Sequence, residues 1–229
     1  MPKFRPVTHV IFDMDGLILD TEKLYKSTVA AIVSDYGKIY SPEVRLAVMG
    51  TKAFDSAKII VESLNIPITV EEFATRAKEE QAKVMGDANL MPGAERLIRH
   101  LHYSKVPIAI ATSSSHENFV LKTAKHAELF RYFHHIVKGS EDPEVKEGKP
   151  APDIFLVASR RFQAMPPPEK CLVFEDSPNG VKAAVRAGMQ VVMVPEEYVP
   201  DEYKQDATIV LKSLLDFKPE DFGLPPFPN

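Results

Sequence analysis

Five short, largely apolar runs constrain the fold of this chain more than any other feature of its sequence. Because the apolar residues in each run are consecutive instead of alternating, we expect strands that are covered on both faces, as in parallel sheets. Helical patterns lie between the later runs, and strands that alternate with helices predict an α/β fold with right-handed crossovers. The expected strands are 7–13, 106–112, 134–137, 171–176 and 190–194, and the expected helices are 92–104, 115–127, 152–162 and 178–188.

Residues 20 to about 88 interrupt this alternation, because they contain helical patterns only. A helical block between the first strand and the rest of a sheet is most simply a small domain inserted into the core. We therefore predict a Rossmann-like parallel-sheet core formed by residues 1–18 and 89–229, with an inserted all-helical cap formed by residues 19–88. The proline-rich end of the chain, FGLPPFPN, excludes a helix or an inner strand and predicts a surface position.

The composition limits the class of protein. With 229 residues, 45% of them hydrophobic, the chain can form one well-packed domain or one domain with an insert. A formal net charge of −4 and the lack of a lysine or arginine stripe argue against a nucleic-acid partner. No apolar run approaches the ~20 residues of a membrane span, and an aspartate comes too early for a secretory signal. The single cysteine, Cys171, excludes an internal disulfide and fits a reducing compartment, so we expect a cytoplasmic protein. We also expect a monomer.

Polar side chains follow the predicted strands at the points where the strands end. In open parallel sheets, ligands bind beyond the carboxyl ends of the strands, so we expect these side chains to meet at one rim. A lysine that precedes the helix at 152–162 can reach the same rim. The residues concerned are Asp13, Asp15, Thr112, Ser113, Ser114, Lys149, Glu175, Asp176 and Ser177.

This set of side chains suits both a cation and a phosphoryl group. Clustered carboxylates raise one another's pKa unless a cation neutralises them. Carboxylate oxygens suit Mg²⁺, which keeps bound waters and accepts a substrate phosphate oxygen. Lys149 and the hydroxyl groups would then face the phosphoryl group. A carboxylate beside it can attack phosphorus and form an aspartyl-phosphate.

Each of these signals also has a simpler interpretation. The sequence DMDG suits a turn or half of a calcium-binding loop, although Leu17 and Ile18 stand where that loop needs an acidic residue and a glycine. The run TSSS is also typical of a loop or a helix cap. Lysines such as Lys149 are usually solvated at the surface. The acidic pair at 175–176 could simply cap the next helix. The ordered occurrence of all four signals, each after an apolar run or before a helix, favours the functional interpretation.

The segments DMDGLILDTE, ATSSS, GKPAPDIF and VFEDSPNGV resemble the four motifs of haloacid-dehalogenase-like phosphohydrolases with a helical cap. The resemblance implies that Asp13 is the nucleophile and that Asp15 acts first as general acid and then as general base. It implies that Thr112 and Lys149 hold the phosphoryl oxygens, assisted by the backbone amides of Met14 and Ser113. It also implies a Mg²⁺ ion held by Asp13, the carbonyl group of Asp15 and Asp176, with Glu175 close by.

The same resemblance implies that the substrate is a small phosphomonoester. The segments THVIFDMDGLILDTE, MPGAERLI, DPEV, KCLVFEDSPNGV and AGMQVVMVP are most similar to a branch that acts on pseudouridine 5′-phosphate. A sugar or polyol phosphate is the alternative substrate, and a catalytically silent relative that binds a phosphometabolite is the alternative function. Tyr25 stands where sugar-phosphate mutases carry a histidine, which weakens the mutase interpretation, and Asp15 argues against a dehalogenase.

Selectivity is expected to come from the cap, because the rim handles only phosphate and metal. Glu22 and Tyr25 share one face of the first cap helix, and Lys52 follows Gly50 in the loop MGTKAF. We expect Tyr25 to contact the base or ribose and Lys52 to contact a polar group beyond the phosphate. The alternative is that Tyr25 packs within the cap and that Lys52 is solvated.

Overall fold

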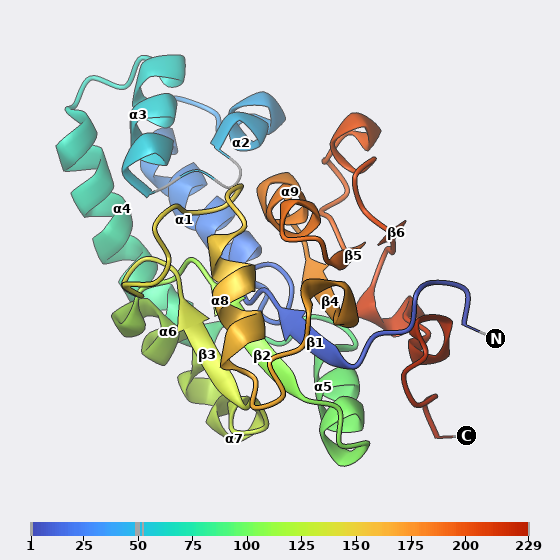
Figure 1. Cartoon of the computed structure of the whole chain (residues 1–229). Coiled ribbons are helices and arrows are strands. Elements are labelled where there is room, and N and C mark those ends of the chain that lie inside the picture. Colours follow the sequence, from blue (N-terminus) through green and yellow to red (C-terminus); the bar gives the residue numbers. More distant parts are fainter. Residues whose placement is uncertain (1, 49–50, 52, 229) are drawn as a thin grey trace.

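A parallel six-stranded sheet forms the centre of the computed structural model, which describes residues 2–48, 51 and 53–228 (Figure 1). The strand order β3–β2–β1–β4–β5–β6 places the first strand of the chain between the second and the fourth. All five expected runs form strands, and the strands pair in parallel, so the predicted α/β fold is confirmed. The strands are β1 (His9–Phe12), β2 (Ile108–Thr112), β3 (His135–Lys138), β4 (Cys171–Glu175), β5 (Gln190–Met193) and β6 (Ile209–Val210).

The helices begin close to the predicted positions, since polar caps precede several of them. Ser115 accepts a hydrogen bond from the backbone N–H of Asn118, and Ser177 accepts one from Gly180, so each satisfies an otherwise unpaired donor. Within the described ranges, no helix has both the length and the apolar content needed to cross a bilayer. The α-helices are α1 (Thr21–Ser34), α2 (Pro42–Val48), α3 (Ala53–Leu64), α4 (Val70–Val84), α5 (Ala94–Tyr103), α6 (His116–Thr123), α7 (Ala127–Phe130), α8 (Asp153–Arg161) and α9 (Pro178–Arg186).

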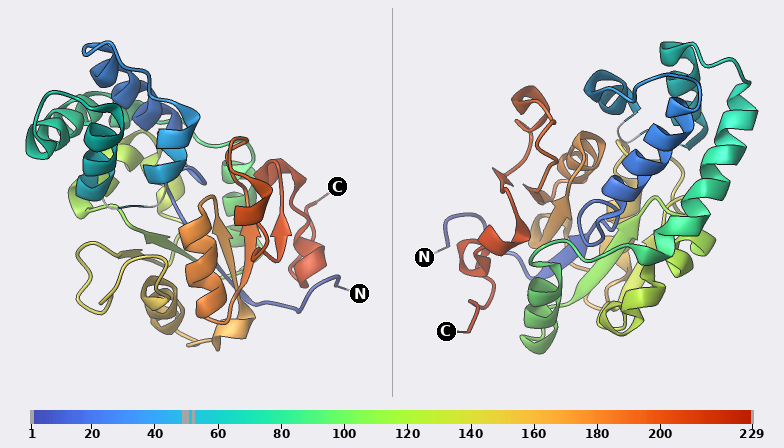
Figure 2. Two further views of the ribbon diagram at one scale, coloured as in Figure 1. Left: turned by 90° about the horizontal axis from the view of Figure 1, so that it is seen from above. Right: turned by 180° about the vertical axis from the view of Figure 1, so that it is seen from behind.

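The sheet is apolar on both faces, as the consecutive apolar runs predict. Successive strand residues point to opposite faces. Phe12 packs with residues of α5 and α7 in one buried cluster, whereas Ile11 packs with residues of α8 and α9 in another. Helices therefore cover the sheet on both sides (Figure 2). Since neither face can accept charge, charged side chains are confined to the ends of the strands.

Helices α1 to α4 form a separate lobe, drawn at the top of Figure 1. This lobe buries a hydrophobic cluster of its own, which includes Ile32 and Phe73. The two chain segments that lead into and out of the lobe lie side by side, because Leu19 pairs with Leu90 and the N–H of Asp20 donates to the carbonyl oxygen of Asn89 at 2.9 Å. The exact division of the chain at residues 18 and 89 stays a prediction.

The carboxyl-terminal segment differs from the prediction. Phe222 and Leu224 are buried, and the ring of Phe222 stacks on that of Phe4 with 4.6 Å between centroids. The expected surface position is therefore wrong for these two residues. Prolines exclude helix and inner strand, but they do not prevent neighbouring apolar side chains from closing the open side of a hydrophobic cluster.

The hydrophobic cluster of the α1–α4 lobe predicts that truncating Phe73 destabilises the protein strongly. This ring is 1% exposed, so the change Phe73→Ala should leave a cavity and lower the free energy of unfolding by about 3–5 kcal/mol. Ile39 lies in the same lobe and is 81% exposed, so Ile39→Ala should change it by less than about 0.5 kcal/mol. Urea denaturation followed by circular dichroism measures both. Equal effects of the two changes would contradict a packed cap core.

Candidate active site

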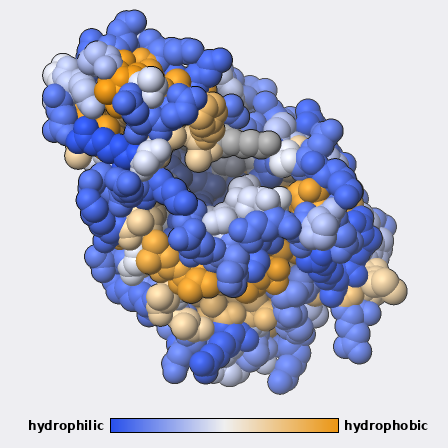
Figure 3. Space-filling view, turned by 90° about the vertical axis from the view of Figure 1, so that its left-hand side faces the viewer, coloured by the Kyte–Doolittle hydropathy of each residue, from blue (hydrophilic) through white to orange (hydrophobic). Residues whose placement is uncertain are grey.

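The candidate site lies where β2, β1 and β4, which are neighbours in the sheet, reach their carboxyl ends. The register pairs Phe12 with Ile110 on one side and with Phe174 on the other, so the segments that follow these strands begin side by side. Asp13, Thr112 and Glu175 are the first polar residues at this rim. The helical lobe lies above it, and the molecular surface is hollowed between the lobe and the body (Figure 3).

Lys149 forms ion pairs with two carboxylates, one that follows β1 and one at the end of β4. Its side chain is 8% exposed, and its Nζ donates to Asp13 Oδ1 at 2.5 Å and to Glu175 Oε1 at 2.7 Å. A third donation goes to the carbonyl oxygen of Ala111 at 3.2 Å. Burial alone would lower the pKa of Lys149, but Asp13 and Glu175 raise it above its ordinary value. The structure therefore makes this lysine a buried, ion-paired cation at the rim and not a solvated surface residue.

Glu175 holds the Lys149 side chain and the turn that follows β4 through hydrogen bonds. Its Oε2 atom accepts hydrogen bonds from the N–H groups of Asp176 and Ser177 and from the Ser177 hydroxyl group, each at 3.0 Å. A Cβ atom at Gly180 would lie 1.7 Å from Glu175 Oε1, so a glycine is needed beneath this carboxylate. With both oxygens occupied, Glu175 is suited to hold Lys149 and the turn after β4, and less suited to bind a metal ion directly.

Asp176 lies against the turn that follows β1. A Cβ atom at Gly16 would meet Asp176 Oδ2 at 2.2 Å, and Gly16 has a φ of +78°, so this turn needs glycine for both space and conformation. The carboxylate of Asp176 is thereby placed beside the backbone that joins Asp15 to Gly16. Asp13, Asp176 and the carbonyl oxygen of Asp15 are hard oxygen donors of the kind that Mg²⁺ prefers.

The described residues contain no group of three or more histidine, cysteine, aspartate and glutamate side chains arranged to hold a metal ion. The candidate Mg²⁺ ligands do not require such a group of three side chains, because they are the carboxylates of Asp13 and Asp176 and the backbone carbonyl oxygen of Asp15. The charges favour a cation there. Burial raises the pKa of Asp13 to about 7, and Glu175 and Asp15 contribute to this rise. Burial also raises the pKa of Asp176 well above its ordinary value, and Glu175 and Asp13 add to the effect.

Asp15 has a different set of partners from Asp13. Its Oδ1 accepts hydrogen bonds from Lys122 Nζ at 2.6 Å and from the Thr21 hydroxyl group at 2.8 Å. Its Oδ2 accepts one from the Ser114 hydroxyl group at 2.8 Å. Burial would raise the pKa of Asp15, but Lys122 and these hydrogen bonds hold it below its ordinary value. Each of the two aspartates in DMDG therefore has its own lysine.

The two candidate phosphate-binding residues after β2 differ in exposure. Thr112 is fully buried, and its hydroxyl oxygen accepts a hydrogen bond from the N–H of Ser114 at 3.1 Å. Ser113 is exposed, so its backbone is accessible at the rim. The Thr112 hydroxyl group lies 3.5 Å from Asp15 Oδ2, and Ser113 follows it directly in the chain.

Lys122 is a residue of the candidate site that sequence reasoning missed. It lies on α6, in the segment ENFVLKTAKH, where Phe119, Lys122 and Thr123 share the inward face of the helix. A lysine at a position where the helical pattern expects an inward-facing residue is unusual, and this was the available signal. Its partners follow β1, follow β2 and lie on α1, and no local pattern shows that these three distant segments meet at Lys122.

The cap residues proposed for selectivity are placed only in part. Tyr25 accepts a hydrogen bond from Lys122 Nζ at 2.7 Å, so its hydroxyl group already has a partner in the core. Glu22 lies close to the metal-binding candidates, with its Cγ 3.1 Å from the Cβ position of Gly16. Burial raises the pKa of Glu22 to about 7, and Asp15 and Glu196 contribute. Lys52 and Gly50 lie outside the described residues.

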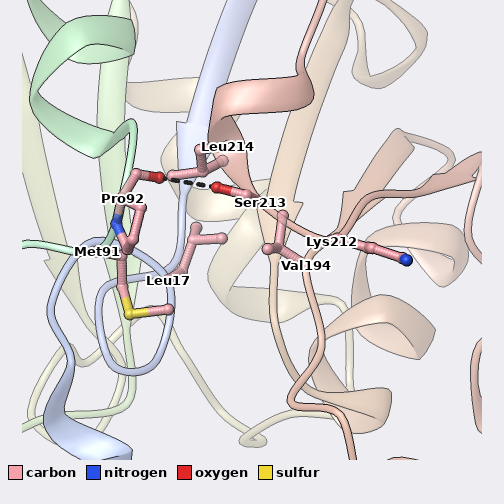
Figure 4. Close-up of a pocket in the computed structure, with 7 residues that line it drawn as sticks. All are labelled: Leu17, Met91, Pro92, Val194, Lys212, Ser213 and Leu214. Carbon is pink, nitrogen blue, oxygen red and sulfur yellow. Dashed lines mark hydrogen bonds between the residues drawn. The ribbon is translucent and has the colours of Figure 1, made fainter.

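A separate apolar pocket of about 130 Å³ lies on the other side of the β1 turn (Figure 4). Ser213 donates a hydrogen bond to the carbonyl oxygen of Pro92 at 3.2 Å, and the charged end of Lys212 points away from the other side chains. The pocket therefore offers no set of converging polar groups for chemistry. Its lining residues are Leu17, Met91, Pro92, Val194, Lys212, Ser213 and Leu214.

Comparison with known proteins identifies relatives over nearly the whole chain. Residues 7–188 match the family model of haloacid dehalogenase-like hydrolases. The chain is 55% identical to a Drosophila melanogaster protein named probable pseudouridine-5′-phosphatase, over 97% of this chain and 96% of the relative. It is 50% identical to the mitochondrial (DL)-glycerol-3-phosphatase 1 of Arabidopsis thaliana, over 96% of this chain and 75% of the relative.

The solved structures support the same assignment of the fold. A HAD family hydrolase of Deinococcus radiodurans, solved with phosphate and sodium bound, superposes with a TM-score of 0.78. The match covers 97% of this chain and 100% of that chain, at 24% sequence identity. At this identity the likeness establishes the fold, that is, the arrangement of sheet, helices and cap, and not the activity or the substrate.

The contact between Glu175 and Gly180 predicts that a methyl group at residue 180 is not tolerated. The change Gly180→Ala should displace Glu175 and lower the free energy of unfolding by roughly 1–3 kcal/mol, as overpacking does elsewhere. Gly148→Ala is the matched control, because its Cβ would meet nothing within 4 Å. Urea denaturation of the two variants provides the comparison. If both retain wild-type stability, Glu175 is not packed as described.

Proposed function

Because this chain belongs to the haloacid dehalogenase-like hydrolase family, we propose that it hydrolyses pseudouridine 5′-phosphate to pseudouridine and phosphate. Its relatives are named as phosphatases, and the chain is a phosphoric monoester hydrolase of that family, acting on a phosphorylated small molecule. The observation that carries the proposal is the buried Asp13 carboxylate, which lies 2.5 Å from the Lys149 ammonium at the rim. We propose that Asp13 is the nucleophile and Lys149 the phosphate-binding cation, and their contact supports these roles.

In the first step, an oxygen of Asp13 attacks the phosphorus atom of the ester. The bond between phosphorus and the ester oxygen breaks, and its electron pair stays on that oxygen. Protonated Asp15 donates a proton to the same oxygen, so the leaving group departs as an alcohol. Lys149 and the backbone at Ser113 stabilise the charge on the remaining phosphoryl oxygens. The product of this step is an aspartyl-phosphate on Asp13.

In the second step, a water molecule attacks the phosphorus atom of the aspartyl-phosphate. Asp15, now a carboxylate, accepts a proton from that water. The bond between phosphorus and Asp13 breaks, which restores the Asp13 carboxylate and releases phosphate. The hydrogen bonds to Asp15 favour its ionised form, which is the form that this second step requires.

We propose that Mg²⁺ is the cofactor, held by the Asp13 carboxylate, the Asp15 carbonyl oxygen and the Asp176 carboxylate. When bound, it would neutralise these carboxylates and polarise a phosphate oxygen of the substrate. The raised pKa values of Asp13 and Asp176 support this proposal, because burial and then neighbouring carboxylates disfavour the charged forms, and a bound cation would offset both effects. Glu175 takes a supporting position in this proposal, since both of its oxygens are already hydrogen-bonded.

A nucleoside leaving group is supported by the polar and aromatic groups between the cap and the core. Arg45 of α2 lies over the ring of Tyr198, which follows β5, at 5.0 Å from the centroid. The Arg45 Nε atom is buried without a hydrogen-bond partner in the described part of the chain, so it can donate to a ligand. Burial and then the charge of Glu22 raise the pKa of Tyr198, which places Glu22 near the same ring. A base with carbonyl acceptors fits these groups better than glycerol does.

We also propose that the protein is a cytoplasmic monomer. Cys171 is unpaired and buried, as expected of a chain that folds in a reducing compartment.

The proposal is tested with four phosphate esters and one variant. Release of phosphate should have its highest kcat/KM for pseudouridine 5′-phosphate, lower values for its isomer uridine 5′-phosphate and for glycerol 3-phosphate, and a measurable value for p-nitrophenyl phosphate. Asp13→Asn should abolish release from all four, because an amide is a far poorer nucleophile. A higher kcat/KM for glycerol 3-phosphate would replace the nucleotide with a polyol phosphate. Undiminished release by Asp13→Asn would refute the mechanism.

The carboxylate cluster predicts that Mg²⁺ stabilises the protein more at high pH. The pKa of Asp13 is about 7 in the folded protein and ordinarily 3.8, so the folded state holds an extra proton between these values. Stability of the metal-free protein should therefore decrease as pH rises from 5 to 8, and Mg²⁺ should restore it at pH 8. Thermal unfolding with Mg²⁺ or a chelator measures this. Asp176→Asn should reduce the Mg²⁺-dependent rise in Tm, whereas equal rises in wild type at pH 5.5 and pH 8 would contradict the assignment.

A further inference from the structure

Lys122 is a buried cation that contacts no reacting atom in the phosphoryl chemistry proposed above. Its side chain is 1% exposed, and Nζ donates to Asp15 Oδ1 at 2.6 Å, to the Tyr25 hydroxyl group at 2.7 Å and to Ser114 Oγ at 2.9 Å. These three acceptors use all three N–H bonds of the ammonium group. A lysine is rarely buried so completely unless it is paired. Here one of its partners is the proposed acid–base residue.

The contacts restrict the orientation of the Asp15 carboxylate. Lys122 contacts Oδ1 directly, and Ser114, which accepts from Lys122, donates to Oδ2 at 2.8 Å. One ammonium group therefore acts on both oxygens. The final torsion of an aspartate is broad and has no sharp intrinsic minima, so external donors must define it. Since proton transfer requires a positioned donor, the orientation of Asp15 bears directly on the leaving-group step.

Lys122 also connects Asp15 to the cap. Tyr25 lies on α1 in the cap lobe, whereas Lys122 lies on α6 in the core. The ammonium group bonds the Tyr25 hydroxyl group and also lies 5.0 Å from the centroid of the Tyr25 ring. A displacement of α1 relative to α6 would therefore remove one of the three acceptors of Lys122.

We propose that Lys122 is a positioning residue, which orients Asp15 for proton transfer to the leaving oxygen and makes that orientation depend on Tyr25 of the cap. The inference rests on the proposed phosphatase function. The competing explanation is that Lys122 only neutralises a buried carboxylate. The two explanations differ in their effect on esters whose leaving groups do or do not need a proton.

The test compares alkyl and aryl phosphates in the variant Lys122→Met. The kcat/KM value reports the steps up to the aspartyl-phosphate, and p-nitrophenolate leaves without a proton. We expect kcat/KM to fall roughly 10- to 100-fold for pseudouridine 5′-phosphate and glycerol 3-phosphate, and less than about threefold for p-nitrophenyl phosphate. Lys125→Met, an exposed lysine bonded to Asn89, is the matched control and should leave all three values unchanged. Equal losses on alkyl and aryl esters, or no loss on either, would overturn the proposal.

The cap connection is tested by a double-mutant cycle. Tyr25→Phe should lower kcat/KM for the alkyl esters in the wild-type background and have no further effect in Lys122→Met, because its influence passes through the ammonium group. Additive effects would refute the connection. In an Asp15→Asn background, adding Lys122→Met should likewise leave the ratio of kcat/KM for alkyl esters to kcat/KM for p-nitrophenyl phosphate unchanged. If Lys122→Met does not fold, as judged by circular dichroism, the ester comparison is made with Tyr25→Phe, and equal losses there overturn the proposal.

Failure of this inference and failure of the proposed function give different results. A wild-type protein that releases no phosphate from any ester refutes the proposed function, and the inference with it. An active wild type, an inactive Asp13→Asn variant and a Lys122→Met variant that behaves like Lys125→Met refute the inference alone.

Discussion

Two buried ion pairs, Lys149 with Asp13 and Lys122 with Asp15, are the interactions on which the site depends. Carboxylates at the ends of apolar strands lose most of their hydration, and this loss is tolerated only where a cation or hydrogen-bond donors replace the water. The helices on both faces of the sheet leave only the strand ends for such groups. The charge, the nucleophile and the candidate metal ligands are therefore concentrated at one rim, beneath the cap.

The two lysines do not balance the cluster completely. Asp13 and Asp176 keep pKa values above their ordinary range, with burial as the main cause and neighbouring carboxylates as the next. Asp15 differs, because Lys122 and two hydroxyl groups stabilise its charge. Two aspartates separated by one residue thus experience opposite environments. The environment of Asp13 and Asp176 favours a bound cation, whereas that of Asp15 favours the ionised form that the proposed water-activating step requires.

Much of the fold follows from local patterns in the sequence. Consecutive apolar residues predicted all five longer strands, and the helices predicted at 115–127 and 178–188 begin at the polar caps Ser115 and Ser177. The local patterns failed for a strand that is too short to show a pattern and for segments whose structure depends on their tertiary neighbours. Strand β6 has two residues, too few for any pattern, and the helix expected at 115–127 is divided into α6, a 3₁₀ turn and α7. Phe222 and Leu224 are buried because the cluster beneath them would otherwise be open, which a proline-rich sequence does not reveal.

By itself, the sequence determined which chemical groups stand at the strand ends, because strand position and residue type are local properties. Asp13, Asp15, Thr112 and Asp176 were identified in this way, and Lys149 was identified by its place before a helix. Only the tertiary structure decided which of these groups pair. Lys122 lies 107 residues from Asp15, and its partner Tyr25 lies in the inserted cap. Both oxygens of Glu175 are occupied by Lys149 and by the turn after β4, so neither is free for a metal ion. Pairing depends on the direction of each side chain after the chain has folded, and directions across such separations are set by packing, which no local pattern encodes.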